Sequence, residues 1–536
     1  MKFVFRFLVV TIWVLSAPLT WAQESGSVRP APPVREAPFR TAYDSAQAVL
    51  RLRAQLDHLF TAATHSGASV GVVVRAVKSG KVLYERNPTA PLTPASNTKL
   101  FSTLAVFHAL GAGGTIATEV RATARIDPSG TLNGDLYLVG RGDVMLSAAD
   151  MEVIADELFA MGLRTVRGTV YGDGSWFDSV TNRAVYSGDF EDVVALPPVT
   201  ALSHTGGQIA VVVSATGKGY VTAQTVPASE SIIVRTTTKK SSRRRRLSAT
   251  SAVDASGRVV ITVSGSPGAN RTQTLYVPAR SPELVAAGTF ANRLRTGGIG
   301  HEGTIAAGVA PRNARLLVAF ERPFLEIASV VNKRSHNHYA EHVFKLAAAL
   351  YGGAGAGADQ GKAALLAALD SLDVQSQGAI FHDGSGLSRR NRVSARTHVD
   401  MLCAIARQPY FNDFYSSLAI AGVDGSLRRR MIGTPAHDNL RGKTGTLRNV
   451  SSLGGYVTTG DGELLAFSML SNGPRTSSYK STENAAGSIL AAFTYAPAEK
   501  PSDVSNPAPD PESDPESDPE SDVEEELQVP HEDVEE

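Results

Sequence analysis

The sequence is poor in several residue types, and each shortage narrows what the protein can be. Its 536 residues include one cysteine, which excludes an intrachain disulfide and a zinc site built from thiolates. That residue, Cys403, lies in an apolar run, so we expect its side chain to be buried. Aromatic residues make up 7% of the chain and charged residues 19%, whereas 43% are hydrophobic. This composition excludes a wholly disordered or fibrous protein, and the length predicts two to four domains.

Net charge is also lacking, because 52 Lys and Arg residues balance 52 Asp and Glu residues. The charges are unevenly distributed, since the segment from Pro501 onward has 15 acidic residues and no Lys or Arg. This segment repeats Asp-Pro-Glu-Ser three times from Asp510 and cannot form a core, so we predict a disordered acidic tail over residues 497–536. The rest of the chain is therefore basic.

A long apolar run is missing everywhere except at the N-terminus. Lys2 and Arg6 precede an apolar stretch over residues 7–19, and small residues before Gln23 are typical of a cleavage site. We predict a signal peptide over residues 1–22, which is too short to span a membrane, and no transmembrane span in the mature chain. Export of a chain with one cysteine fits a bacterial periplasm.

A dense basic run extends from Lys239 to Arg246. Such a run can bind nucleic acid, but an exported protein meets no nucleic acid, so no such partner is expected. We expect a solvent-exposed loop; contact with an anionic envelope polymer or with the acidic tail is the alternative.

Periodicity predicts a mixed α/β organisation. The β-branched run from Ser69, the turn around Gly80 and the return through Tyr84 predict a β-hairpin. Leucines and phenylalanines at helical spacing predict a helix from Leu100 to Leu110, ended by Gly111. The middle third, about 120–315, consists of short Val/Thr/Ile-rich runs separated by Gly, Asp and Pro, which is typical of strands. Further helices are predicted over 49–60, 324–351 and 362–373, and a strand over 464–470.

Ser96 and Lys99 form a Ser-x-x-Lys motif in the first turn of the helix that follows the hairpin. A spacing of three places both side chains on one helical face, within hydrogen-bonding reach. A lysine can activate a serine only when its amine is neutral, which burial and a nearby cation favour. The motif is weak by itself, because Ser477 and Lys480 repeat it and Ser96 could simply cap a helix.

Two further motifs strengthen the assignment. Ser335 and Asn337 form the only Ser-x-Asn triplet of the sequence, and Lys443 begins its only Lys-Thr-Gly. Ser-x-x-Lys, Ser-x-Asn and Lys-Thr-Gly, in that order, are the active-site set of penicillin-binding proteins and serine β-lactamases.

With these motifs and their surroundings, the sequence resembles the low-molecular-mass class C penicillin-binding proteins, the D-alanyl-D-alanine carboxypeptidase/endopeptidase family (peptidase family S13). The resemblance covers roughly residues 45–495 and includes the segments 331–342, 383–389 and 442–446. The long separation between Ser96 and Ser335 is similar to that family's insertion of two extra domains and exceeds what a β-lactamase allows.

The resemblance implies an α/β (α+β) penicillin-binding/serine β-lactamase-like transpeptidase domain with a strand-rich two-domain insertion between the first two motifs. Residues 23–40 would be a linker, and the catalytic domain would comprise 40–118 and 316–496. The insertion would occupy 119–315, with a third domain nested at about 147–225.

The resemblance also implies roles for individual residues. Ser96 would be the nucleophile and Lys99 its base, Ser335 would relay a proton, and Asn337 would donate to the substrate amide. Lys443 would supply positive charge for the substrate carboxylate. The oxyanion hole would consist of the backbone N–H groups of Ser96 and Thr446. The implied substrate-binding residues are Thr444, Gly445, Asp143 and Leu447.

Asp143 follows a Gly-x-Gly stretch, and the resemblance implies contact with the free amine of a diaminopimelate side chain, with Leu447 assisting. The alternative for Asp143 is a turn cap between strands. Gly445, without a side chain, would let substrate lie against the strand edge. His336, His338 and His342 have poor metal-ligand spacing, so no metal is expected.

The resulting hypothesis is a serine D-alanyl-D-alanine carboxypeptidase and/or endopeptidase that acts on peptidoglycan stem peptides and is acylated by β-lactams. It needs no cofactor. One alternative is a β-lactamase or esterase of the same fold. Another, of a different class, is a non-catalytic wall-binding scaffold, although all three motifs are intact.

Overall fold

The computed structural model describes residues 42–65, 67–190, 195–215, 221–237, 245–255, 258–268 and 270–495. The predicted signal peptide, the linker over 23–40 and the acidic tail lie outside the described residues, as does most of the basic run from Lys239. Among the helices in the described ranges, none combines the length and the apolar character needed to cross a membrane.

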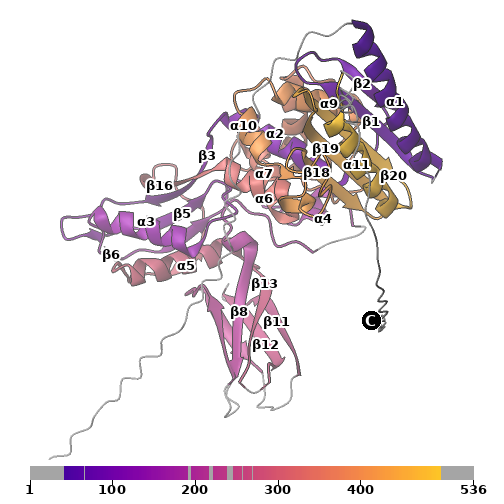
Figure 1. Ribbon diagram of the computed structural model, residues 1–536. Coiled ribbons are helices and arrows are strands. Elements are labelled where there is room, and N and C mark those ends of the chain that lie inside the picture. The colour runs from indigo at the N-terminus through magenta and orange to yellow at the C-terminus, as the bar shows by residue number, and fades with distance from the viewer. Residues whose placement is uncertain are drawn as a thin grey trace, which may run out of the picture. The chain divides into compact units, whose positions relative to one another are not determined.

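A six-stranded antiparallel sheet carries the Lys-Thr-Gly motif on β18 and has the strand order β17-β18-β19-β20-β1-β2 (Figure 1). The predicted hairpin is confirmed as β1 and β2, and β1 pairs along its whole length with β20 from the C-terminal part of the chain. The strands span Ser69–Ala76 (β1), Val82–Arg86 (β2), Ala419–Ile420 (β17), Arg441–Leu447 (β18), Val450–Thr458 (β19) and Leu464–Asn472 (β20).

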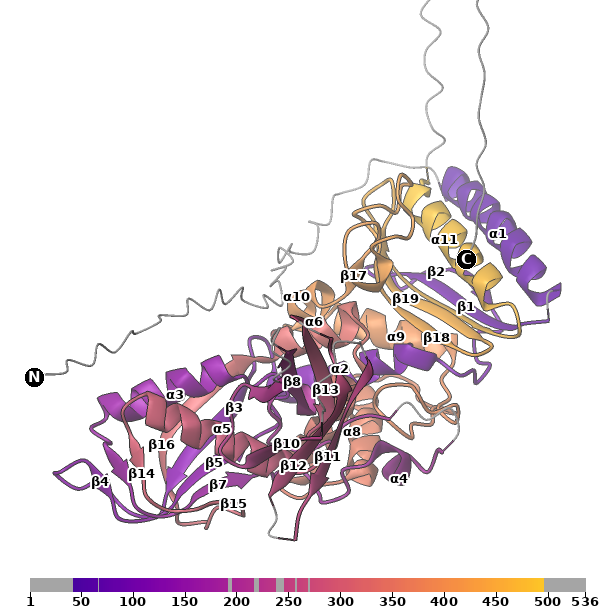
Figure 2. The ribbon, with the colours of Figure 1, turned by 90° about the horizontal axis from the view of Figure 1, so that it is seen from below.

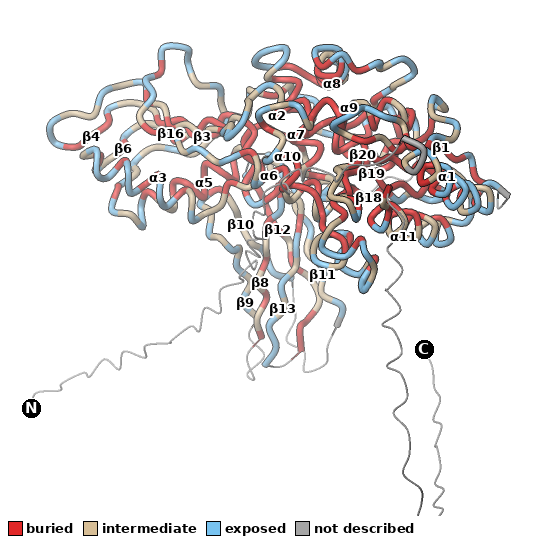
Figure 3. Tube along the Cα trace, turned by 45° about the horizontal axis from the view of Figure 1, so that its top comes forward, coloured by how far each residue is buried: buried red, intermediate tan, exposed pale blue. Residues whose placement is uncertain are grey.

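Helices cover both faces of this sheet. On one face, α1 (Ala42–His65) and α11 (Thr476–Ala492) lie side by side (Figure 2). Alternate residues of β1 serve the two faces: Val72 and Val74 join the core under these helices, and Val73 joins the opposite core. Figure 3 shows the central strands as largely buried. On the opposite face, α9 (Ala395–Ile405) packs on the central strands, and the same core contains α2 (Thr98–Leu110), α6 (Phe324–Lys333), α7 (Asn337–Gly352), α8 (Ala358–Asp370) and α10 (Phe411–Ser416).

The helix predicted over 324–351 is wrong as one element, because the chain breaks between α6 and α7. Ser335 lies at the break with φ +56°, which an α-helix cannot include. His336 then caps α7 by accepting a hydrogen bond from the Tyr339 backbone N–H. The break places Ser335 between the two helices and Asn337 in the first turn of α7. The helix from Leu100 is confirmed as α2 and ends at Gly111.

The strand-rich character of the middle third is confirmed. One part is a five-stranded sheet, β15-β7-β5-β3-β16, whose core also contains α3 (Ala148–Ala160) and α5 (Pro282–Thr296). The strands are Thr115–Ala122 (β3), Leu136–Gly140 (β5), Val170–Asp173 (β7), Ile305–Ala307 (β15) and Arg315–Pro323 (β16). A small sheet accompanies it, formed by Thr131–Leu132 (β4), Thr165–Val166 (β6) and Gly300–His301 (β14).

A second part of the insertion consists of two three-stranded sheets, β10-β12-β11 and β13-β8-β9, around a shared core of Val, Ile and Leu. Their strands are Gln208–Ala215 (β8), Val221–Val226 (β9), Ile232–Thr236 (β10), Arg245–Val253 (β11), Val259–Ser266 (β12) and Thr272–Pro278 (β13). These sheets extend from 208 to 278 and so overlap only partly with the bounds of about 147–225 predicted for a nested domain, whereas α3 and β7 belong to the five-stranded unit. The division into domains itself stays a prediction.

Candidate active site

Ser96 lies in a short 3-10 turn, η1 (Ala95–Asn97), that leads directly into α2. Ala95 has φ +48°, a strained conformation for a residue with a side chain, and such strain is often found next to reactive groups. The Ser96 hydroxyl accepts a hydrogen bond of 2.9 Å from the Lys99 ammonium group. The alternative of a helix cap is wrong, because Asn97 occupies the N-cap position of α2.

Lys99 is fully buried, and its amino group has three hydrogen-bond acceptors around it. Besides Ser96, it donates to Asn337 Oδ1 at 2.8 Å and to the backbone carbonyl of Ser385 at 2.5 Å. Burial lowers the pKa of Lys99 to about 7, although the negative charges of Asp383 and Glu341 oppose the shift. A large neutral fraction therefore exists near pH 7, as a lysine base requires.

Lys443 brings the third motif next to the first two. It is fully buried on β18 and donates to the Ser335 hydroxyl at 2.8 Å and to the Thr444 carbonyl at 2.7 Å. Burial and the positive charge of nearby Lys99 lower the pKa of Lys443 well below its usual value. Tertiary folding thus joins Ser96, Lys99 and Asn337 in one hydrogen-bonded group and Ser335 with Lys443 in another beside it.

The remaining residues of β18 form an open strand edge. Within the part of the chain that the structure describes, β17 pairs only with Arg441 and Gly442, which leaves 443–447 without a partner on that side. Thr446 is exposed and Leu447 half-buried on this stretch. The Thr444 hydroxyl donates to the Ser426 hydroxyl at 2.8 Å. An extended peptide can add to an edge of this kind as a further strand.

The structure requires a glycine at position 445 because neighbouring residues leave no room for a side chain there. A Cβ there would lie 2.2 Å from Ser452 Oγ and 2.7 Å from the Pro94 carbonyl oxygen. The missing side chain therefore lets β18 approach its neighbour β19 and the turn that carries Ser96. The expectation that substrate lies against the strand edge at Gly445 stays a prediction.

Comparison with known proteins agrees with this arrangement. The sequence model of the D-Ala-D-Ala carboxypeptidase 3 (S13) family matches residues 52–493. The chain belongs to this family. A D-alanyl-D-alanine carboxypeptidase of Actinomadura sp. (strain R39) is 34% identical over 444 residues, which cover 79% of this chain and 81% of the relative. The D-alanyl-D-alanine carboxypeptidase DacB of Haemophilus influenzae is 25% identical over 431 residues, or 77% and 88% of the two chains.

Solved structures confirm the fold of this S13 family member. The crystal structure of penicillin binding protein 4 (dacB) from Haemophilus influenzae has a TM-score of 0.62 at 24% identity and covers 79% of this chain and 93% of that chain. A second structure of that protein, complexed with a β-lactam, has a TM-score of 0.59 at 23% identity and covers 81% and 97%. The predicted penicillin-binding fold class is therefore confirmed.

Asp143 of this S13 protein is buried in an ion pair apart from the two lysine groups. Both of its carboxylate oxygens accept from Arg322 Nε, at 3.0 and 2.9 Å, and one also accepts from the Met145 backbone N–H. Arg322 additionally contacts Asp150 and Glu326. These contacts match the alternative of a turn cap, and the substrate contact predicted for Asp143 stays a prediction.

The site also contains two buried acidic residues that the sequence did not predict as site residues. Glu341 and Asp383 are fully buried, and both face the Lys99 amino group closely enough to affect its pKa. Glu341 lies four residues after Asn337 and hence on the same face of α7, which is a detectable signal. Asp383 precedes a Gly-Ser-Gly segment, and no local pattern indicates that it folds against α2.

The histidines contact one another rather than forming a ligand set. The rings of His338 and His342 lie 4.4 Å apart, and burial lowers the pKa of His342 to about 4. Among the residues that the structure describes, no group of three or more His, Cys, Asp or Glu side chains could hold a metal ion. Cys403 is buried, as predicted.

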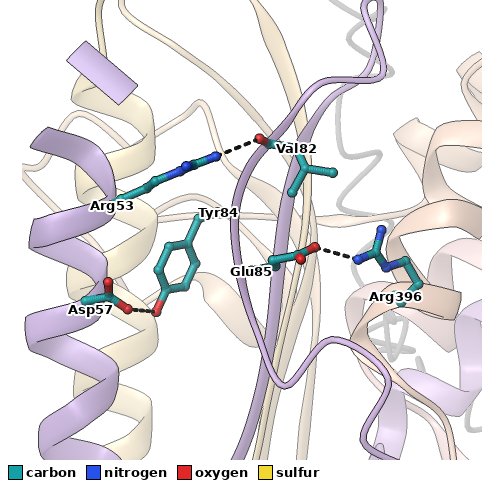
Figure 4. Close-up of a pocket in the computed structure, with 6 residues that line it drawn as sticks. All are labelled: Arg53, Asp57, Val82, Tyr84, Glu85 and Arg396. Atoms are coloured by element: carbon teal, nitrogen blue, oxygen red, sulfur yellow. Dashed lines mark hydrogen bonds and ion pairs between the residues drawn. The ribbon is translucent and has the colours of Figure 1, made fainter. Parts of the chain in front are cut away.

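A pocket of about 460 Å³ lies between α1 and β2 and contains none of the predicted site residues (Figure 4). Its polar lining is paired internally: Tyr84 donates to Asp57, Arg396 contacts Glu85, and Arg53 donates to backbone carbonyls of β2. The motif residues, and not this pocket, therefore remain the candidate active site.

Proposed function

We propose that this S13 protein is a serine-type D-alanyl-D-alanine carboxypeptidase that works through an acyl-enzyme on Ser96. The observation that carries the proposal is the hydrogen bond between Ser96 and a fully buried Lys99. Burial provides the neutral amine, and the short distance lets that amine take the proton of the attacking hydroxyl.

In the acylation step, Ser96 Oγ attacks the carbonyl carbon of the bond between the two D-alanines, and its proton passes to Lys99 Nζ. The backbone N–H groups of Ser96 and Thr446 receive the oxyanion that develops on the carbonyl oxygen. The C–N bond then breaks as D-alanine leaves with a proton returned through Ser335 and Lys443. The hydrogen bond between these last two residues supports that route.

In the deacylation step, water attacks the Ser96 ester and gives up a proton, which releases the shortened stem peptide and restores the hydroxyl. The Asn337 side-chain oxygen accepts a hydrogen bond from Lys99, so its side-chain nitrogen would donate to the substrate amide. Lys443 would recover its charge when a substrate carboxylate binds, since an opposite charge favours the ammonium form that burial disfavours.

The open edge of β18 supports a peptide substrate, which would lie along Thr444 to Leu447 as an added strand. Stem peptides of peptidoglycan fit this edge in extended form, and hydrolysis of a cross-link between two stem peptides would be the endopeptidase reaction. A β-lactam would acylate Ser96 in the same way as the D-alanyl carbonyl does. The similar protein from Haemophilus influenzae has been crystallised with a β-lactam.

Peptidoglycan lies outside the bacterial cytoplasm, so this function requires export. The basic, apolar and small residues over 1–22 support a signal peptide, and we propose a periplasmic location. The proposed steps use only side chains and backbone groups of this chain and water, and we assign no cofactor.

The experiment that tests the proposal is intact-mass analysis after incubation with penicillin, followed by peptide mapping. We expect one penicilloyl adduct on Ser96 in the wild type and none in Ser96→Ala. Ser477→Ala is the matched control, because Ser477 belongs to the second Ser-x-x-Lys motif and is exposed on α11. This control should be acylated as the wild type is.

Three outcomes would contradict the proposal. An adduct that persists in Ser96→Ala would place the nucleophile elsewhere. Rapid loss of penicillin from solution without hydrolysis of a D-Ala-D-Ala peptide would favour the β-lactamase alternative. A wild type that neither forms an adduct nor consumes penicillin or peptide would favour the scaffold.

A further inference from the structure

Residues 174–190, here called the strap, belong to the inserted part by sequence but pack against the catalytic helices. The strap follows β7 and contains the short helix α4 (Arg183–Ser187). Phe177 is part of the same apolar core as α2 and α7 and forms a β-bridge with Ala356. Lys345 of α7 forms an ion pair with Asp178. The insertion therefore contributes structure to the catalytic core.

Two strap side chains bind the two buried acids near Lys99. Arg183 forms a buried ion pair with Asp383, with Nη1 and Oδ2 2.8 Å apart. The Tyr186 hydroxyl donates to Glu341 Oε2, also at 2.8 Å. Tyr186 is three positions after Arg183, so one face of α4 presents both groups.

The same acids hold the loop that follows Asp383. Glu341 Oε1 accepts from the Ser385 N–H at 2.9 Å, and Asp383 Oδ1 accepts from the Gly386 N–H at 3.0 Å. The Gly386 N–H and the Ser385 carbonyl belong to one planar peptide group and point in opposite directions. Because Asp383 fixes the N–H, the carbonyl is directed at Lys99, which it reaches at 2.5 Å.

This loop decides how the Lys99 amine is oriented. A neutral lysine amine has two N–H groups and one lone pair. The protonated amine donates to all three acceptors, including the Ser96 hydroxyl. In the neutral amine, Asn337 Oδ1 and the Ser385 carbonyl accept the two remaining N–H groups, which leaves the lone pair for the Ser96 hydroxyl. A base in this orientation can take the serine proton without first rotating.

We propose that the strap positions Lys99: its Arg183 and Tyr186 hold, through two buried carboxylates, the loop that binds the lysine amino group. Arg183 and Tyr186 are positioning residues, since neither contacts Ser96. The inference deepens the proposed function and rests on it, because it requires Lys99 to act as the base.

The charges around Lys99 determine in which direction its pKa should shift when a strap residue is replaced. The titratable and charged groups that face Lys99 or its two neighbouring carboxylates are Glu341, Asp383, Lys443, His336, Arg183 and Tyr186. Negative charge on Glu341 and Asp383 favours protonated Lys99, and the Tyr186 hydrogen bond favours ionised Glu341. The positive charge of Arg183 also favours ionised Glu341. Loss of the Tyr186 hydroxyl or of the Arg183 charge should therefore favour neutral Lys99.

The test is the pH dependence of the rate constant for acylation of the full-length protein by a fluorescent penicillin. In Tyr186→Phe we expect a slower reaction and an acid-side midpoint at lower pH than in the wild type, by up to about one pH unit. In Arg183→Gln the midpoint should also move to lower pH, because the Arg183 charge stabilises ionised Glu341. The matched control is Asn182→Ala, which removes the α4 cap on the Ala184 N–H without touching either acid, and its midpoint should stay unchanged.

Shifts to lower pH in both variants, with an unchanged control, would support the inference, because loosening of the strap that lets water reach Lys99 would raise its pKa and move the midpoint to higher pH. Equal midpoints in all four proteins, or the same shift in the control, would overturn it and leave the proposed function standing. A wild type that forms no Ser96 adduct would overturn both. Circular dichroism checks folding, and if Arg183→Gln does not fold, the comparison of Tyr186→Phe with Asn182→Ala decides.

Discussion

Acidification should slow acylation of the wild-type protein steeply, because only neutral Lys99 can accept the Ser96 proton. With a pKa of about 7, the neutral fraction of Lys99 falls to about one tenth at pH 6 and about one hundredth at pH 5. The rate constant for acylation should follow that fraction and lose roughly tenfold for each pH unit below 7. The physical cause is burial: an exposed lysine would be almost wholly protonated over this range.

The assay is the second-order rate constant for labelling by a fluorescent penicillin between pH 5 and 9. In Lys99→Arg, the labelling rate constant at pH 8 should fall by on the order of 10²- to 10⁴-fold, because a guanidinium does not lose its proton and cannot act as the base. Lys480→Arg, in the second Ser-x-x-Lys motif, is the matched control and should behave as the wild type does. A wild-type rate that is flat between pH 5 and 8, or that rises only near pH 10, would refute a role for neutral Lys99.

Two further variants test the packing around the site. Gly386→Ala should reduce both the acylation rate and the thermal stability, because its Cβ would lie 1.9 Å from the Ala95 carbonyl oxygen. Gly378 has a similar positive φ but open space around it, so Gly378→Ala should lower the free energy of unfolding by only about 1 kcal/mol. Equal Tm losses in the two would contradict this. Asp143→Asn should cost about 1–3 kcal/mol in denaturant unfolding by weakening the pair with Arg322. Activity should fall equally on peptides with a free and a blocked diaminopimelate amine, and a selective loss on the free amine would instead support substrate contact.

The motif residues could be predicted because their residue types recur at short, fixed spacings along the chain. A spacing of three on a helix is enough to bring Lys99 to Ser96, and the structure places their polar atoms 2.9 Å apart. The hairpin from Ser69 and the helix from Leu100 followed from alternation and helical periodicity in the same local way. The S13 family model matches residues 52–493 of this chain, which confirms the resemblance based on these motifs.

Other features could not be predicted, because they depend on residues far apart in the sequence. The break at Ser335 interrupts a run that is helical by periodicity, and a positive φ there has no composition signal. The close approach of Pro94 and Ser452 to Gly445 is another such feature, because only the folded sheet brings these residues together. Asp143 similarly meets Arg322 across a long stretch of chain.

By itself, the sequence determined the reactive groups, their order and the family, because helical and strand periodicities and short motifs act over a few residues. Only the tertiary structure decided the chemical state of those groups. Lys99 becomes a competent base because folding removes it from water and surrounds it with acceptors from distant segments. Desolvation and hydrogen-bond geometry are properties of the packed core, and no local pattern encodes them.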